Sequence, residues 1–179
     1  MSSARSAAAP LVGLFSTFLY LTPAYAAVSC RALPNDFEFC TAGTVWHDAE
    51  NFAFEGAVIL EREDLWLEVM PLPEEMTNQP LDAMMDSLAS EYAHQALEEG
   101  ARAPENLNRE SFQTTQIDAV MLTMTEFENG GEYVVVTAVL QANDRHIILA
   151  LDGDAAYSAS EMEQNMRKIA ELIRPTEEG

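Results

Sequence analysis

Residues 110 to 151 restrict the possible folds of this chain most strongly, because they contain little besides strand patterns. Tyr133 to Leu140 is apolar on both faces of a strand, and such a strand has to be covered on both sides. Asn129-Gly-Gly131 and Ala142-Asn-Asp144 are typical turn sequences that flank it. These patterns predict a mainly antiparallel sheet with strands at 110–116, 120–128, 132–141 and 145–151.

Two amphipathic helices are predicted to cover this sheet. The first spans 80–99, with Pro80 at its first position and Gly100 just past its end. Its apolar residues at helical spacing are Leu81, Met84, Met85, Leu88, Tyr92 and Ala96. The second spans 160–173, and either Ser160 with Glu163 or Ser158 with Glu161 fits a capping box.

Shorter strands precede the first helix. Phe37 and Phe39, then Phe52 and Phe54, alternate with polar neighbours, and 57–60 with 65–70 reads as a hairpin around 61–64. Residues 100–109 are polar and predict a loop. The order of strands, helix, strands and helix predicts an α+β fold, a three-layer α-β-α sandwich with a helix on each face of a mainly antiparallel sheet.

The first 26 residues have the pattern of a secretory signal peptide. Arg5 precedes an apolar run at 11–21, and Ala24-Tyr-Ala26 supplies the small residues of a cleavage site. This run is well short of the about 20 residues that cross a bilayer, and no later run reaches that length. We therefore expect a periplasmic or secreted product without a transmembrane segment, with residues 27–179 as a single domain; a membrane anchor and lipidation of Cys30 are the alternatives.

Cys30 and Cys40 are the only cysteines of the chain. In an oxidising compartment, a lone pair is expected to form a disulfide. It would join the mature N-terminus to the strand at 36–40 and contribute a little under about 3 kcal/mol. Catalytic redox pairs are normally separated by two residues, so we expect this bridge to be structural.

The net charge of the chain restricts the classes of molecule that it can bind. It has 30 acidic residues against 9 basic ones, a formal net charge of -21, while its 48% of hydrophobic residues fits a globular protein. Such a field repels nucleic acid and anionic lipid surfaces. Basic partners stay compatible with it, as does the simpler interpretation of a solubilising surface.

Patterns that would indicate catalysis or a cofactor are missing from the sequence. His47, His94 and His146 are far apart, and no nucleophile elbow, phosphate loop or dinucleotide fingerprint occurs. Asp152, Asp154 and Glu163 match positions 1, 3 and 12 of a calcium loop, but Tyr157 stands where the loop needs glycine. We expect no catalytic residues, no metal site and no cofactor.

Several short segments resemble the PsbP/Mog-like superfamily, which includes the DcrB-like bacterial envelope proteins. The matching segments, which lie between Asp36 and Arg174, are Gly43-Thr-Val-Trp46, Pro71-Leu-Pro73, Pro80-Leu-Asp-Ala-Met84, Gln116-Ile-Asp-Ala119 and Leu172-Ile-Arg174. Asp118 departs from the small residue common at its position. The resemblance implies an α-β-α sandwich and a mostly non-enzymatic role, as an accessory subunit, adaptor, chaperone-like or envelope protein. It supplies no catalytic residues.

Together these patterns predict a non-enzymatic exported accessory protein that binds a protein partner in the cell envelope or assists envelope assembly. One alternative is a small-ligand or cation carrier with a groove between sheet and helix. Another is a hydrolase with two converging carboxylates. Residues 46–48 with Phe52 and Phe54 could line a peptide groove, although core positions are the default for such aromatics.

Overall fold

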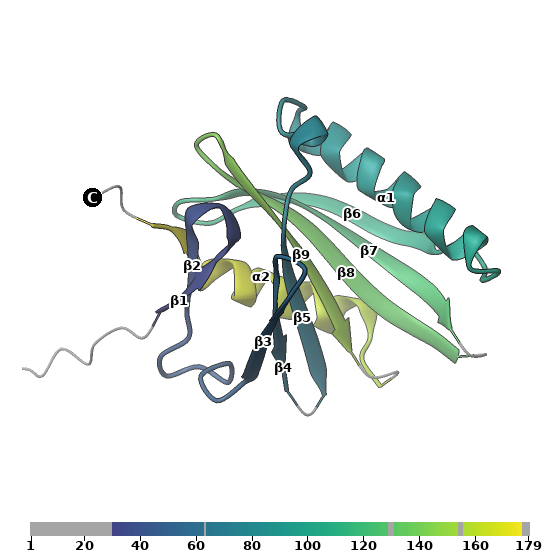
Figure 1. Ribbon diagram of the computed structural model, residues 1–179. Coiled ribbons are helices and arrows are strands. Elements are labelled where there is room, and N and C mark those ends of the chain that lie inside the picture. The colour runs from purple at the N-terminus through teal and green to yellow at the C-terminus, as the bar shows by residue number, and fades with distance from the viewer. Residues whose placement is uncertain (1–29, 63, 129–130, 154–155, 177–179) are drawn as a thin grey trace, which may run out of the picture.

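The computed structural model describes residues 30–62, 64–128, 131–153 and 156–176, and the predicted signal peptide lies outside these ranges. Its elements, in chain order (Figure 1), are β1 (Cys30–Leu33), η1 (Pro34–Asp36), β2 (Phe37–Cys40), β3 (Glu50–Phe54), β4 (Ala57–Glu61), β5 (Leu65–Pro71), η2 (Glu74–Met76), α1 (Leu81–Glu98), β6 (Glu105–Gln113), β7 (Asp118–Glu128), β8 (Gly131–Ala142), β9 (Arg145–Gly153), α2 (Ala159–Glu171) and β10 (Ile173–Pro175).

The main sheet has seven strands in the order β3-β4-β5-β9-β8-β7-β6, and every neighbouring pair is antiparallel. With its two helices, this sheet confirms the predicted α+β class. β8 lies inside the sheet, as its apolar sequence requires, and β3 and β6 form the two edges.

Consecutive residues of β7 belong to two different apolar clusters, because side chains alternate across a strand. Met121 packs in the cluster that contains Met162, Met166 and Ile169 of α2. Val120 and its even-numbered neighbours pack in the cluster that contains Met84, Met85 and Leu88 of α1. α1 lies over β7 and β8, whereas α2 lies over β8 and β9. The main contacts of α1 with the sheet are therefore at β7 and β8, away from β3.

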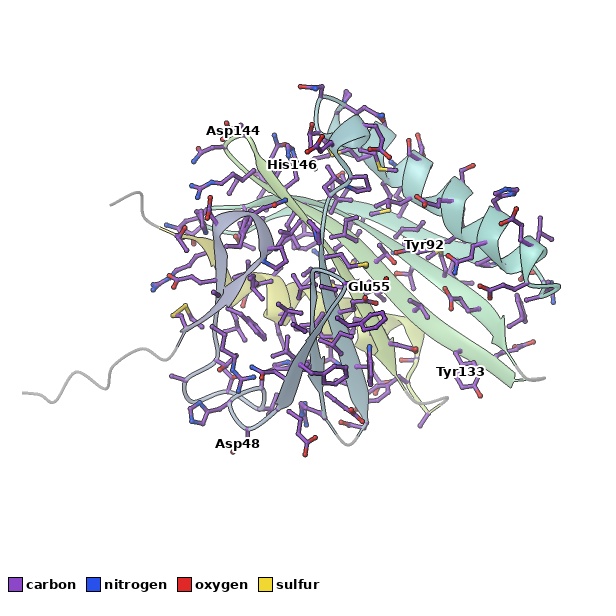
Figure 2. All side chains as sticks on the ribbon, in the orientation of Figure 1. Asp48, Glu55, Tyr92, Tyr133, Asp144 and His146 are labelled. Carbon is purple, nitrogen blue, oxygen red and sulfur yellow. A yellow bond between two sulfur atoms is a disulfide. The ribbon has the colours of Figure 1, made fainter. Side chains whose placement is uncertain are left out.

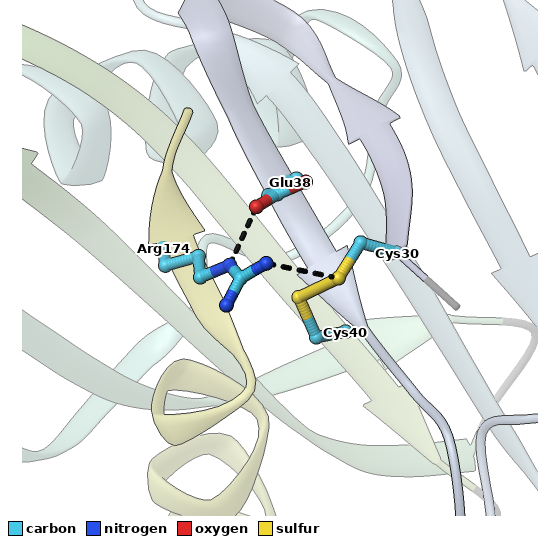
Figure 3. Close-up of a disulfide and its surroundings, with 4 residues drawn as sticks. All are labelled: Cys30, Glu38, Cys40 and Arg174. Atoms are coloured by element: carbon cyan, nitrogen blue, oxygen red, sulfur yellow. Dashed lines mark hydrogen bonds and ion pairs between the residues drawn. A yellow bond between two sulfur atoms is a disulfide. The ribbon is translucent and has the colours of Figure 1, made fainter. Parts of the chain in front are cut away.

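A second, three-stranded sheet of order β1-β2-β10 brings the two ends of the described chain together. Cys30 lies directly opposite Cys40 in the β1–β2 pair, and the two form the predicted disulfide. Arg174 of β10 makes an ion pair with Glu38 and lies 3.5 Å from the Cys30 sulfur (Figure 3). Because the Cys30 sulfur is held in a disulfide in this structure, it has no thiol free for a lipid.

The structure differs from the prediction at three strands, and one of them, β1, lies in a segment where no strand was predicted. β6 begins at Glu105, inside the predicted loop, and β10 occupies 173–175, where the last helix was expected to end. Nearly all of β6 is exposed, so it lacks the apolar alternation that marks a strand. β10 is three residues long and is held by backbone pairing with β2. Backbone pairing of this kind has no sequence pattern of its own.

Candidate functional site: an acidic groove bordered by an aromatic edge

A groove of about 500 Å³ lies between the C-terminal half of α1 and the sheet. Its sheet side includes Glu68 of β5, Glu126 of β7 and Asp152 of β9, and its helix side includes Tyr92 and Glu99. Arg102 is the one basic residue along the groove within the described chain. The groove therefore combines apolar walls with an excess of carboxylates, a surface that favours cationic groups.

Three aromatic side chains lie on this face of the sheet at the border of the groove, and one of them, Trp66, also lines it. Phe52 and Phe54 of β3 and Trp66 of β5 have exposed fractions of 44%, 61% and 37%. The Phe52 and Trp66 rings meet edge to face, with centroids 5.5 Å apart and planes at 73°. We call these three residues the aromatic edge. An exposed aromatic group on a strongly charged domain is typical of an interaction surface.

The register explains why the aromatic edge shares a face with α1. Phe52 pairs with Ile59, which in turn pairs with Glu68, and paired residues project to the same side of a sheet. Glu68 lies in the groove beside α1. The phenylalanines are exposed because α1 lies over β7 and β8 and does not reach β3. The default expectation that these aromatics are core residues is wrong for Phe52 and Phe54.

Tyr92 marks the buried end of the groove and points from α1 toward the sheet (Figure 2). Burial raises the pKa of its phenol above the ordinary value, and Glu126, Glu68 and Glu91 raise this pKa further by repelling the phenolate. The Thr137 side chain opposes part of the shift. Tyr92 is therefore a neutral hydrogen-bonding group at physiological pH, and it adds no charge to the groove.

Arg102 already makes contacts with other residues of the same chain. Its guanidinium lies 4.0 Å from the centre of the Phe127 ring, and it makes an ion pair with Glu105. A cation over an aromatic ring is a favourable contact. This arrangement shows that the groove accommodates a guanidinium beside an aromatic wall.

The segment around Trp46 does not join the aromatic edge. Trp46 is buried against Phe39, at 6.3 Å between ring centroids, and Arg62 lies over its ring. His47 and Asp48 are exposed in the turn that follows. The core expectation is therefore confirmed for Trp46, and the structure separates it from Phe52 and Phe54.

The three histidines occupy separate environments. His94 is exposed on α1 beside Glu98, and His47 lies in a turn. His146 of β9 is buried, and burial lowers the pKa of its imidazole. The only metal-like cluster in the described parts of the chain is Cys30, Glu38 and Cys40. Its cysteines form a disulfide, so their sulfurs are not available as thiolate ligands.

The calcium-loop residues do not converge either. Asp152 lies beside the groove on the α1 side and accepts a hydrogen bond from the Gly153 amide. Glu163 lies on α2, where it accepts hydrogen bonds from Thr123 and Asn108. Asp154 lies outside the described residues. Of the two predicted capping boxes, the structure forms the one between Ser158 and Glu161.

No protein-family model matches the chain, and no functionally characterised protein matches it by sequence. Comparison of folds is more informative. The chain has the PsbP-like fold, which confirms the resemblance predicted from the sequence at the level of structure. The solution structure of CyanoP, the PsbP protein of the cyanobacterium Synechocystis sp. PCC 6803, matches it with a TM-score of 0.56 at 13% identity, over 85% of this chain and 95% of CyanoP.

Two crystal structures match more distantly. PA94 of Pseudomonas aeruginosa, a protein of unknown function, gives a TM-score of 0.45 at 10% identity over 73% of this chain and 99% of its own. LpqN, involved in cell envelope biogenesis of Mycobacterium tuberculosis, gives 0.41 at 10% identity over 86% of this chain and 88% of its own. In the described residues, no helix is both long and apolar enough to span a membrane.

Proposed function

We propose that this protein is a non-enzymatic, exported accessory protein that binds a protein partner in the cell envelope. The observation that carries the proposal is the aromatic edge, which exposes Phe52, Phe54 and Trp66 beside an acidic groove. Exposed aromatic side chains are costly in water unless a partner covers them, and aromatic residues are enriched at protein interfaces.

Export is supported by two features that agree with each other. The first 26 residues have a signal-peptide pattern, and the two cysteines form a disulfide. We place the product in the periplasm or an equivalent space, with residues 27–179 as one domain. Its two helices then form the outer layers of a three-layer sandwich, which leaves the edge strand β3 open to a partner.

The non-enzymatic part of the proposal is supported by how the candidate reactive groups are used. The cysteines are bonded to each other, the histidines are dispersed, and Glu163 is engaged with Thr123 and Asn108. Tyr92 is protonated at physiological pH, as an ordinary tyrosine is, and burial raises its pKa further. These groups have structural uses, and the PsbP-like fold brings no catalytic motif.

The proposal is tested by affinity capture of the tagged mature chain from the native envelope after crosslinking. The matched variants are Phe52→Ser with Phe54→Ser at the aromatic edge and Leu107→Ser, an exposed apolar residue on the opposite edge strand. We expect one specific partner to be recovered with the wild type and with Leu107→Ser, and to be lost with the double variant. Recovery of no specific partner with the wild type, or equal recovery with all three proteins, contradicts the proposal.

The groove itself favours a second candidate, a small-ligand or cation carrier. Its volume of about 500 Å³, partly buried Tyr92 and several carboxylates fit a small organic cation. A thermal-shift screen with metals and cationic metabolites tests this candidate, because a ligand that binds the native state raises the melting temperature. A Glu68→Gln variant should reduce such a shift, and the absence of any shift would remove the carrier from consideration.

A further inference from the structure

β3 ends the sheet on one side. It pairs with β4 along one of its edges, and it has no neighbouring strand on the other edge within the described residues. All five of its residues are exposed. An edge of this kind offers backbone N–H and C=O groups to any extended chain that approaches it.

The β3–β4 turn identifies which backbone groups are offered. Only Glu55 and Gly56 separate the strands, and both have positive φ, at 49° and 89°, as in a type I′ turn. In such a hairpin the residues that flank the turn, Phe54 and Ala57, bond to each other, and this pattern recurs at every second residue. The N–H and C=O groups of Asn51 and Ala53 therefore point away from β4, and no hydrogen bond in the described chain reaches them.

The opposite edge of the sheet is protected, which makes the exposure of β3 informative. A register shift between Asn106 and Asn108 interrupts the pairing of β6. Arg109 forms ion pairs with α1, and Glu110 forms one with Arg167 of α2. Bulges and charged side chains of this kind hinder the addition of another strand. β3 instead carries two phenylalanines and an alanine.

The side chains around β3 define the chemistry of a chain segment that could pair with this strand. Phe52, Phe54 and Trp66 provide apolar contacts on the α1 side of the sheet. Exposed Glu50, Glu55 and Glu61 surround them, and Figure 2 labels Glu55 at the hairpin tip. Glu50 lies on the same face as Phe52 and Phe54, because every second residue of a strand shares a face. A matching strand would therefore carry, on that face, apolar residues opposite the aromatic edge and basic residues on either side of them.

We propose that β3 is the docking edge for an extended segment of the protein partner that carries, on one face, apolar residues flanked by Lys or Arg. The segment adds to the sheet as a further strand beside β3, bonds to the backbone of Asn51 and Ala53, and covers the aromatic edge. This inference rests on the proposed function and specifies how the partner binds. A second copy of the chain fits this edge poorly, because each copy carries a net charge of -21 and would bring Glu50 and Glu55 against their own counterparts.

A defined peptide tests the docking edge directly. The probe, called the Lys-Val peptide, has the sequence Lys-Thr-Val-Thr-Val-Thr-Val-Thr-Lys, which places three valines and two flanking lysines on one face of a strand. It is acetylated and amidated, and it is titrated into the 15N-labelled mature protein. We expect saturable shifts and slowed exchange of the Asn51 and Ala53 amides, together with a change in Trp66 fluorescence. A peptide with Glu in place of Lys should bind at least about tenfold more weakly, by charge repulsion.

Two variants at one position isolate the backbone contact. Ala53→Pro removes an N–H group that points away from β4 and is not bonded to it. This change should weaken binding of the Lys-Val peptide by about tenfold or more. Ala53→Thr keeps that N–H and should bind like the wild type. Glu50→Lys with Glu55→Lys should weaken binding about fivefold or more at low salt, whereas Glu75→Lys, on the exposed surface of η2, should not.

The outcomes separate this inference from the proposed function. If the peptide leaves the Asn51 and Ala53 amides unchanged at millimolar concentration, or if both Ala53 variants bind equally, the docking edge is wrong. If the protein alone forms a dimer that protects these amides, the occupant is a second copy and the inference is also wrong. Envelope capture that recovers the same partner with Ala53→Pro and Ala53→Thr would retain the proposed function while overturning β3 as its site.

Discussion

Removal of the Cys30–Cys40 disulfide is expected to destabilise the protein by a predictable amount. The bridge joins residues 10 positions apart and closes a ring of about 11 residues in the unfolded chain. The chain-entropy relation gives about 9 cal/mol/K for such a ring, or about 2.8 kcal/mol at 25 °C. For a domain of this size, a change of about 1 kcal/mol shifts the melting temperature by about 2–4 °C, so we expect a decrease of about 6–11 °C.

The assay is urea and thermal unfolding of three samples: the oxidised wild type, the reduced wild type and the Cys30→Ser/Cys40→Ser variant. The reduced protein and the variant should agree, because both lack the cross-link while retaining the β1–β2 hairpin. β1 pairs only with β2 among the described strands, so amide exchange should rise most at residues 31–33. Exchange in β8 should change much less.

Two results would refute this reasoning. A loss below about 1 kcal/mol would mean that the reduced hairpin stays closed in the unfolded chain, so that the cross-link constrains little. A loss above about 5 kcal/mol, with faster exchange throughout β8, would mean that the main sheet depends on the small one. The entropic account of the bridge would then be insufficient.

Three further perturbations test other parts of the fold. Ser158→Ala removes the N-cap of α2 and should lower the free energy of unfolding by about 1 kcal/mol in urea titrations, while Ser160→Ala should have little effect. Glu55→Asn places a residue that tolerates positive φ in the β3–β4 turn and should raise the melting temperature by a few degrees, equivalent to about 0.5–1 kcal/mol. Because burial lowers the pKa of His146, the unfolded chain binds its proton first, and stability should fall as the pH drops below about 6.5.

The controls for these perturbations lie in the same molecule. His146→Gln should reduce the loss of stability between pH 7 and pH 5.5, and the same change at exposed His94 should not. If both variants lose as much stability between pH 7 and pH 5.5 as the wild type does, the pH dependence of stability comes from groups other than His146. An Asn at position 55 that lowers the melting temperature would mean that the Glu55 side chain, and not its backbone conformation, matters at the turn.

The sequence predicted those elements in which the spacing of apolar residues indicates which side chains are buried. The apolar residues on both faces of β8 required an interior strand, and Met84, Met85 and Leu88 required a helix packed on a surface. Residues 105–109 of β6 and all of β10 were missed, because backbone pairing with a neighbouring strand holds them and such pairing leaves no pattern in the sequence. The groove was foreseen only in outline, because Tyr92, Glu68 and Asp152 meet through the register of β5 against β9 and the path of α1.

The two phenylalanine pairs explain why the aromatic edge could not be predicted. Phe37 with Phe39 and Phe52 with Phe54 have the same alternating pattern, yet the first pair is fully buried and the second is exposed. Alternation reports only that two side chains share a face, because that is all the geometry of a strand determines. Whether the face is covered depends on which other element reaches it, and α1 lies over β7 and β8 without extending to β3. β3 therefore has the sequence pattern of a core strand, but no helix of the described chain packs on its aromatic face. We propose that a binding partner covers this face.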